Sequence, residues 1–74
     1  MKLVIIEDDF YIENEGHLLF VEREFIDSLL QLKNKHEIKQ YLYTHLLPSL
    51  KIEKEKKILT SWLNNPNTDY TISQ

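Results

Sequence analysis

Several residue types are missing from this chain or nearly so, and each absence excludes a class of site. There is no cysteine, so disulfides and cysteine-ligated zinc or iron–sulfur centres are excluded. A single glycine, Gly16, cannot build a glycine-rich phosphate-binding loop. The chain has no alanine and one arginine against eight lysines and eight isoleucines. This bias is typical of an AT-rich genome, such as that of a low-GC bacterium, its phages or its plasmids.

Long apolar runs are missing as well. The first apolar stretch, Leu3–Ile6, is shorter than a secretory signal requires, and no stretch approaches the roughly 20 residues of a membrane span. We therefore expect a cytoplasmic protein with no membrane association. The 74 residues form one domain near the lower size limit for an independent core, where self-association or a partner often adds stability.

What is present begins with a β-rich segment. Strands are expected over residues 2–7, 10–13 and 17–21. Between the last two, Asn14-Glu15-Gly16 predicts a three-residue hairpin turn with a bulge and with Gly16 at positive φ. The side chains that share one face in this register are Phe10, Ile12, Leu18 and Phe20. Glu7-Asp8-Asp9 is poor strand sequence, so it is expected to be a turn or a bulge.

The period then changes to that of helices. Helices are expected over residues 22–33, from Lys35 or His36 to Leu47, and over 49–64, with Pro48 ending the second. Ile52 and Trp62 of the third helix are expected to face the core. The predicted fold class is therefore α+β, with a small N-terminal antiparallel hairpin or three-stranded meander followed by three short helices. A compact domain spans 1–66 (meander 1–21, helices 22–64), and a polar tail over 67–74 is either disordered or an edge strand.

Charge is unevenly divided along the chain. Residues 1–32 carry a net charge of −6, residues 33–57 carry +4, and Asp69 completes the total of −3. Five acids fall within residues 7–15. The two halves either attract each other as solvated faces of one monomer, or form a bipolar surface that meets a basic partner or a second copy.

No catalytic arrangement is evident. Ser28, Ser49 and Ser61 lie in predicted helices or caps without a nucleophile elbow, so we do not expect an enzyme. His36 and His45, nine residues apart, are half a turn out of phase on an ideal helix. The acids near His17 alternate between the two faces of an extended chain, so a solvated turn is expected rather than a metal site. No metal and no cofactor are predicted.

The opening KLVIIEDD (2–9) resembles the first strand of a phospho-acceptor receiver domain, in which paired acids hold Mg²⁺. That resemblance would imply a phosphorylated Asp on a third strand within a doubly wound fold. Residues 45–55 contain no Asp, and alternating strand–helix units are missing from the pattern. We therefore expect an acidic turn and assign no family.

The remaining prediction is a small non-catalytic binding protein that regulates or inhibits a macromolecule through an acidic hairpin. The expected partner-binding residues are Asp8, Asp9, Glu13 and Glu15. Another protein is the favoured partner, with a homodimer as a further option. The alternative is a dimeric nucleic-acid-binding regulator that uses the lysine-bearing helices, through Lys51, Lys54, Lys56 and Lys57.

Overall fold

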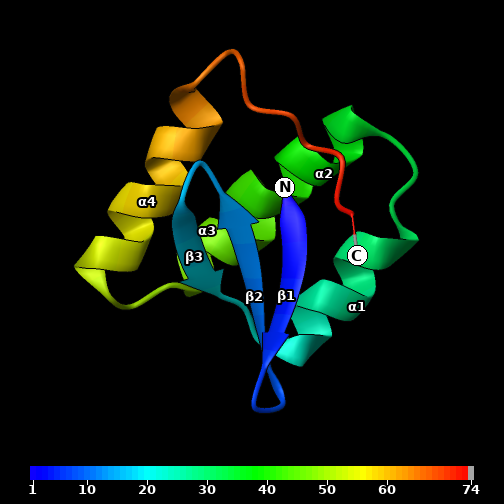
Figure 1. Cartoon of the computed structure of the whole chain (residues 1–74). Coiled ribbons are helices and arrows are strands. Elements are labelled where there is room, and N and C mark those ends of the chain that lie inside the picture. The colour runs from blue at the N-terminus through cyan, green and yellow to red at the C-terminus, as the bar shows by residue number, and fades with distance from the viewer. Residues whose placement is uncertain (74) are drawn as a thin grey trace.

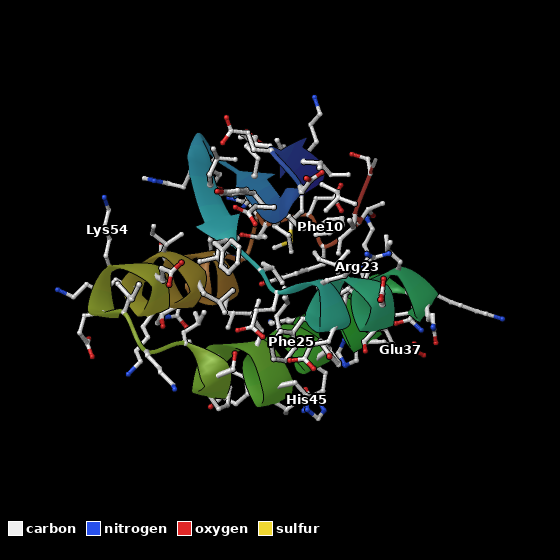
Figure 2. The ribbon with its side chains drawn as sticks, turned by 90° about the horizontal axis from the view of Figure 1, so that it is seen from below. Phe10, Arg23, Phe25, Glu37, His45 and Lys54 are labelled. Carbon is white, nitrogen blue, oxygen red and sulfur yellow. The ribbon has the colours of Figure 1, made fainter. Side chains whose placement is uncertain are left out.

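The computed structural model describes residues 1–73 and confirms the α+β class. The elements are β1 (Lys2–Ile6), β2 (Asp9–Asn14), β3 (His17–Phe20), α1 (Arg23–Gln31), α2 (Lys35–Tyr41), the π-helical turn η1 (Leu42–Leu46), α3 (Leu47–Ser49) and α4 (Glu53–Asn64). The strands form one antiparallel sheet in the order β1-β2-β3. The helices gather on one side of this sheet (Figure 1, Figure 2). None of the helices within residues 1–73 has the length and apolar content to cross a membrane.

Both hairpins turn in only two residues. Ile6 pairs with Asp9 and Asn14 pairs with His17, which leaves Glu7-Asp8 and Glu15-Gly16 as the connections. These four residues have φ of 49, 71, 53 and 80°, the signature of type I′ turns. The positive φ of Gly16 is therefore confirmed, and 7–8 is a turn as expected. The predicted three-residue bulged turn is wrong.

The shorter turn reverses the predicted faces of β3. Ile12 lies opposite Leu19, and Tyr11 lies opposite Phe20. Because side chains alternate along a strand, a shift of one residue moves every side chain of β3 to the other face. Leu19 is fully buried beneath the helices, whereas Leu18 is 47% exposed on the opposite side. The expectation that Leu18 and Phe20 share a face with Ile12 is therefore wrong.

The helical half departs from expectation around Pro48. Helical structure continues from α2 through the wider turn of η1 and ends at Ser49, so Pro48 lies inside it. Pro48 has no N–H and cannot donate the hydrogen bond that a helix residue normally makes to the carbonyl four positions earlier. The irregular η1 turn lies directly before Pro48, where this hydrogen bond is missing. The helix expected over residues 49–64 begins only at Glu53, as α4. The residues before it form a linker in which Leu50 and Ile52 are extended. Ile52, expected in the core, is 60% exposed.

The core lies between the sheet and the helices. It is built from apolar side chains of the sheet, the helices and the C-terminal segment, which pack against one another. Its buried members are Ile12, Leu19, Val21, Ile26, Leu29, Ile38, Leu42, Leu46, Leu50, Leu59, Trp62 and Tyr70. α1 contributes Ile26 and Leu29 and α4 contributes Leu59 and Trp62, each pair three residues apart, so the helical period predicted from the sequence is confirmed for these two helices.

Residues 67–73, expected as a polar tail, lie against the domain. Tyr70 is buried, and its hydroxyl donates to the Trp62 carbonyl at 3.1 Å. Ser73 pairs with β1 in parallel, through Leu3 N to Ser73 O at 2.7 Å and Ser73 N to Met1 O at 3.1 Å. The segment therefore covers the outer edge of β1. Gln74, the last residue of the expected tail, lies outside the described residues.

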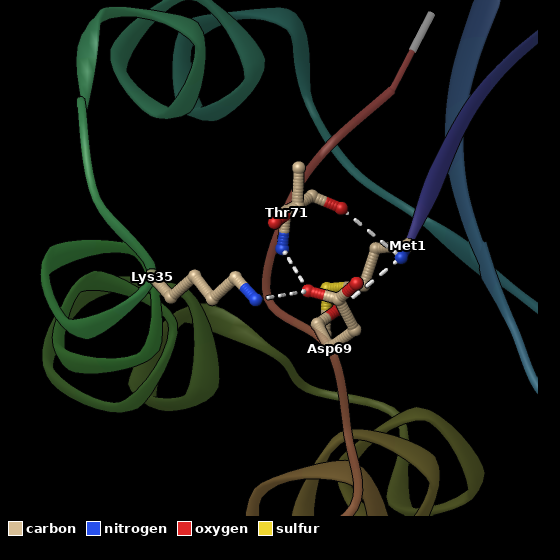
Figure 3. Close-up of polar contacts among 4 residues, drawn as sticks. All are labelled: Met1, Lys35, Asp69 and Thr71. Carbon is tan, nitrogen blue, oxygen red and sulfur yellow. Dashed lines mark hydrogen bonds and ion pairs between the residues drawn. The ribbon is translucent and has the colours of Figure 1, made fainter.

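A polar clamp centred on Asp69 fixes this segment (Figure 3). The Met1 nitrogen donates to the carbonyls of Asp69 and Thr71, both at 3.2 Å. The Asp69 carboxylate accepts from the Thr71 backbone N–H at 3.0 Å and pairs with the Lys35 ammonium at 3.5 Å. Donation from Thr71, with a smaller effect of Lys35, holds the pKa of the Asp69 carboxyl below its usual value of 3.8.

The register is tested by truncating two neighbouring leucines. Leu19→Ala should lower the free energy of unfolding by about 2–5 kcal/mol, because it opens a cavity in the core. Leu18→Ala should lower it by less than about 1 kcal/mol, because the side chain is half in solvent. Urea unfolding followed by the fluorescence of the single tryptophan, Trp62, measures both. A larger loss for Leu18→Ala would contradict the two-residue turn.

The clamp should make stability depend on pH. A carboxyl whose pKa is lower in the folded state stabilises the fold above its unfolded pKa, and this contribution is lost as pH falls through the folded pKa. Asp69→Asn keeps the oxygen that accepts from Thr71 but removes the charge. Wild type should therefore be the more stable of the two at neutral pH, and the difference should shrink as the pH falls through the lowered pKa of Asp69. Asp8→Asn, at the opposite end of β1, is the charge-matched control. An equal pH response in both variants would contradict the clamp.

Candidate functional site

The sheet face turned away from the helices carries a cluster of apolar side chains. Alternation along the three strands places there the set that we call the outer patch, which consists of Val4, Ile6, Tyr11, Leu18 and Phe20. Its central row crosses all three strands, since Val4 lies opposite Tyr11 and Tyr11 opposite Phe20. The Tyr11 and Phe20 rings meet edge to face, with centroids 5.8 Å apart.

Much of this patch is in contact with solvent. Ile6, Leu18 and Phe20 are 44, 47 and 42% exposed, and Val4 and Tyr11 are half-buried. Isolated exposed apolar residues are ordinary on protein surfaces, whereas contiguous ones are rarer and often mark an interaction site. The two turns fix this grouping, because they set which side chains of each strand face outward.

The four acids predicted to bind a partner lie at the two ends of β2. Asp8 and Asp9 lie at the first turn and, with Phe20, line one shallow hollow. Glu13 faces outward at the other end of β2, about 13 Å from Asp9 at the usual rise of a strand. Glu15 lies in the second turn, where its carboxylate accepts from the Asn65 amide at 2.8 Å. The structure therefore places Asp8 and Asp9 at one end of β2 and Glu13 and Glu15 at the other, so the four acids do not form a single acidic cluster.

The four lysines of the alternative prediction do not share one surface. Lys54 and Lys57 lie on the same side of α4 and line one hollow with His17. Lys56 points elsewhere and pairs with Glu53 at 3.5 Å. Lys51 precedes the helix and lines a different hollow. A continuous basic stripe is therefore not formed by this set.

Sequence reasoning missed the first of these hollows, which we call the α4 hollow. It measures about 440 Å³ between the start of β3 and α4, and is lined by His17, Lys54, Lys57, Ile58, Ser61 and Trp62. Within residues 1–73 the buried indole N–H of Trp62 has no hydrogen-bond acceptor. Such a group costs about 1–3 kcal/mol. In the sequence, the helical spacing of residues 54, 57, 58 and 61 indicates that these side chains share one side of a helix. Only the fold shows that His17 lies beside them.

The two helical histidines line a further hollow of about 550 Å³. His36 and His45 both line it, together with Tyr41, whose ring lies 4.7 Å from the His45 ring. The sequence placed the two histidines out of phase on an ideal helix, but the intervening η1 turn has a different period. Residues 1–73 contain no group of three His, Asp or Glu side chains arranged to hold a metal ion.

The chain was also compared with known proteins. No protein-family model, no curated protein and no solved structure matches it. Functional inference for this protein therefore depends on the surfaces described above.

Proposed function

We propose that this chain is a small binding protein that regulates or inhibits a macromolecular partner, and that it docks through the outer patch. The observation that carries the proposal is an aromatic and aliphatic cluster that lies on the face without helices and is bordered by acids. Protein interfaces commonly combine an apolar centre rich in Tyr and Phe with a polar rim. The outer patch and its acids have this arrangement.

The rim indicates the chemistry of the partner. Asp8 and Asp9 border one end of the outer patch and Glu13 the other. The cations near this rim are Lys2, opposite Glu13, and Arg23, which lines the hollow of Asp8 and Asp9. A surface of this kind is complementary to a protein surface that presents apolar side chains within a ring of lysines and arginines. Electrostatic complementarity of this type raises the rate of association and disfavours acidic competitors.

Docking through the outer patch is tested with matched double variants. Leu18→Ser with Phe20→Ser should abolish retention of the partner by immobilised protein in a bacterial lysate, because it removes the apolar centre of the interface. Tyr43→Ser with Leu30→Ser is the control, since these side chains are 61 and 41% exposed and lie on η1 and α1 rather than on the sheet. Circular dichroism confirms that both variants fold. If both doubles retain the same protein equally well, the outer patch is not the docking surface.

The acids are tested separately. Replacing Asp8, Asp9, Glu13 and Glu15 by Asn or Gln should slow association with the captured partner by about tenfold at low salt, and the effect should shrink as salt is raised. Surface plasmon resonance over a series of salt concentrations measures the rate. An unchanged association rate at low salt would show that the acids do not take part in binding.

Nucleic-acid binding through Lys51, Lys54, Lys56 and Lys57 remains the alternative prediction. The lysines that share one side of α4, Lys54 and Lys57, are the feature that supports it. Phosphate contacts would make the affinity for duplex or single-stranded DNA fall steeply with salt. Treating the lysate with nuclease separates the two candidates, because only a partner bound through nucleic acid would be lost.

A further inference from the structure

The α4 hollow differs from the rest of the surface in the chemistry of its walls. Five of its six lining residues, His17, Lys54, Lys57, Ser61 and Trp62, can donate hydrogen bonds, and the lining contains no carboxylate within the described part of the chain. Two of the donors are ammonium groups. The protein as a whole carries a net charge of −3, so this concentration of donors is not a consequence of composition.

One helix and one strand end bring these groups together. The α4 members recur at spacings of three and four residues, so they form one stripe along the helix. Lys54 extends from α4 on the side toward the sheet (Figure 2). His17 opens β3, which packs against α4 and lies beside it (Figure 1). The stripe is therefore closed on one side by the sheet.

Acids near the hollow are occupied elsewhere. Glu15 precedes His17 by two residues, but its carboxylate accepts a hydrogen bond from the Asn65 amide at 2.8 Å. Glu53 accepts from Lys56 at 3.5 Å. Lys54 and Lys57 are both exposed residues, so their side chains can be reached by an anion in solution.

The remaining walls are apolar. Ile58 is half-buried and Trp62 is buried, and the indole N–H of Trp62 has no hydrogen-bond acceptor within the described residues. The volume of about 440 Å³ falls within the range of about 300–1,000 Å³ typical of small-molecule sites. It exceeds what a bare inorganic anion would fill.

We propose that the α4 hollow binds a small organic phosphate of the size of a nucleoside monophosphate. The phosphoryl oxygens accept from Lys54 and Lys57, with Ser61 and His17 as further donors, and the apolar body of the ligand packs on Ile58 and Trp62. Charge-assisted hydrogen bonds from ammonium to phosphate are among the strongest that a protein surface offers. This site is separate from the outer patch and does not depend on the proposed docking function.

The test uses AMP as the probe in a buffer free of phosphate. Trp62 is the single tryptophan, so its indole N–H gives one assignable signal in a ¹H–¹⁵N spectrum. We expect this signal to shift saturably with AMP. Lys54→Gln with Lys57→Gln should weaken binding by at least about tenfold. Lys51→Gln with Lys56→Gln removes the same charge near the same helix and should change binding by less than about twofold.

Two further ligands distinguish the sources of the phosphoryl group. Adenosine, which lacks the phosphate, should leave the Trp62 signal unmoved, and inorganic phosphate should bind more weakly than AMP. Inorganic phosphate binding as tightly as AMP would support phosphoryl recognition and overturn the role of the apolar walls. The site itself is overturned by an unmoved Trp62 signal at about 10 mM AMP, by adenosine binding equal to that of AMP, or by equal losses in the two lysine doubles.

Discussion

The length of the turn at Glu15 and Gly16 decides which side of the sheet the helices cover. With two residues in the turn, Ile12 and Leu19 face inward together, and one more residue would turn Leu19 to solvent. The turn is not free of cost, because Glu15 at φ 53° is a non-glycine residue in the left-handed region. That conformation costs about 1–2 kcal/mol. Burial of a leucine contributes about 1.5–3 kcal/mol, so the packing of Leu19 alone is enough to offset it.

The same register leaves the sheet with two edges that the chain treats differently. The C-terminal segment pairs with β1 through Ser73, and the Asp69 clamp holds it there. At the other edge β3 is short, and α4 packs beside it rather than pairing with it. Short or covered edges reduce pairing with other chains. The α4 hollow lies at this edge, between the start of β3 and α4.

The sequence predicts what depends on periodicity and misses what depends on chain geometry. The α+β class, the helical stripes and the positive φ of Gly16 follow from local patterns. The register does not, because a glycine at positive φ suits both a two-residue turn and a three-residue bulged turn. The apolar period also placed Ile52 in the core, although the backbone there is extended linker.

The candidate surfaces show the same division. The acids at 7–15 were visible as a cluster, yet β2 runs between them and separates Asp8 and Asp9 from Glu13 and Glu15. Adjacency in sequence predicts adjacency in space only within a turn or along one face of an element. The α4 hollow joins His17 to residues some 40 positions later, and no local pattern carries that information.

Both proposed surfaces share β3, and the alternation of its side chains keeps them apart. His17 lines the α4 hollow, whereas its neighbour Leu18 belongs to the outer patch on the opposite face. A macromolecule docked on the outer patch would therefore leave the hollow open. The two surfaces also differ in charge, since Asp8, Asp9 and Glu13 border the apolar patch, whereas Lys54 and Lys57 line the hollow beside α4. Because each surface has its own charge and its own apolar residues, the two proposed binding functions are compatible in one molecule.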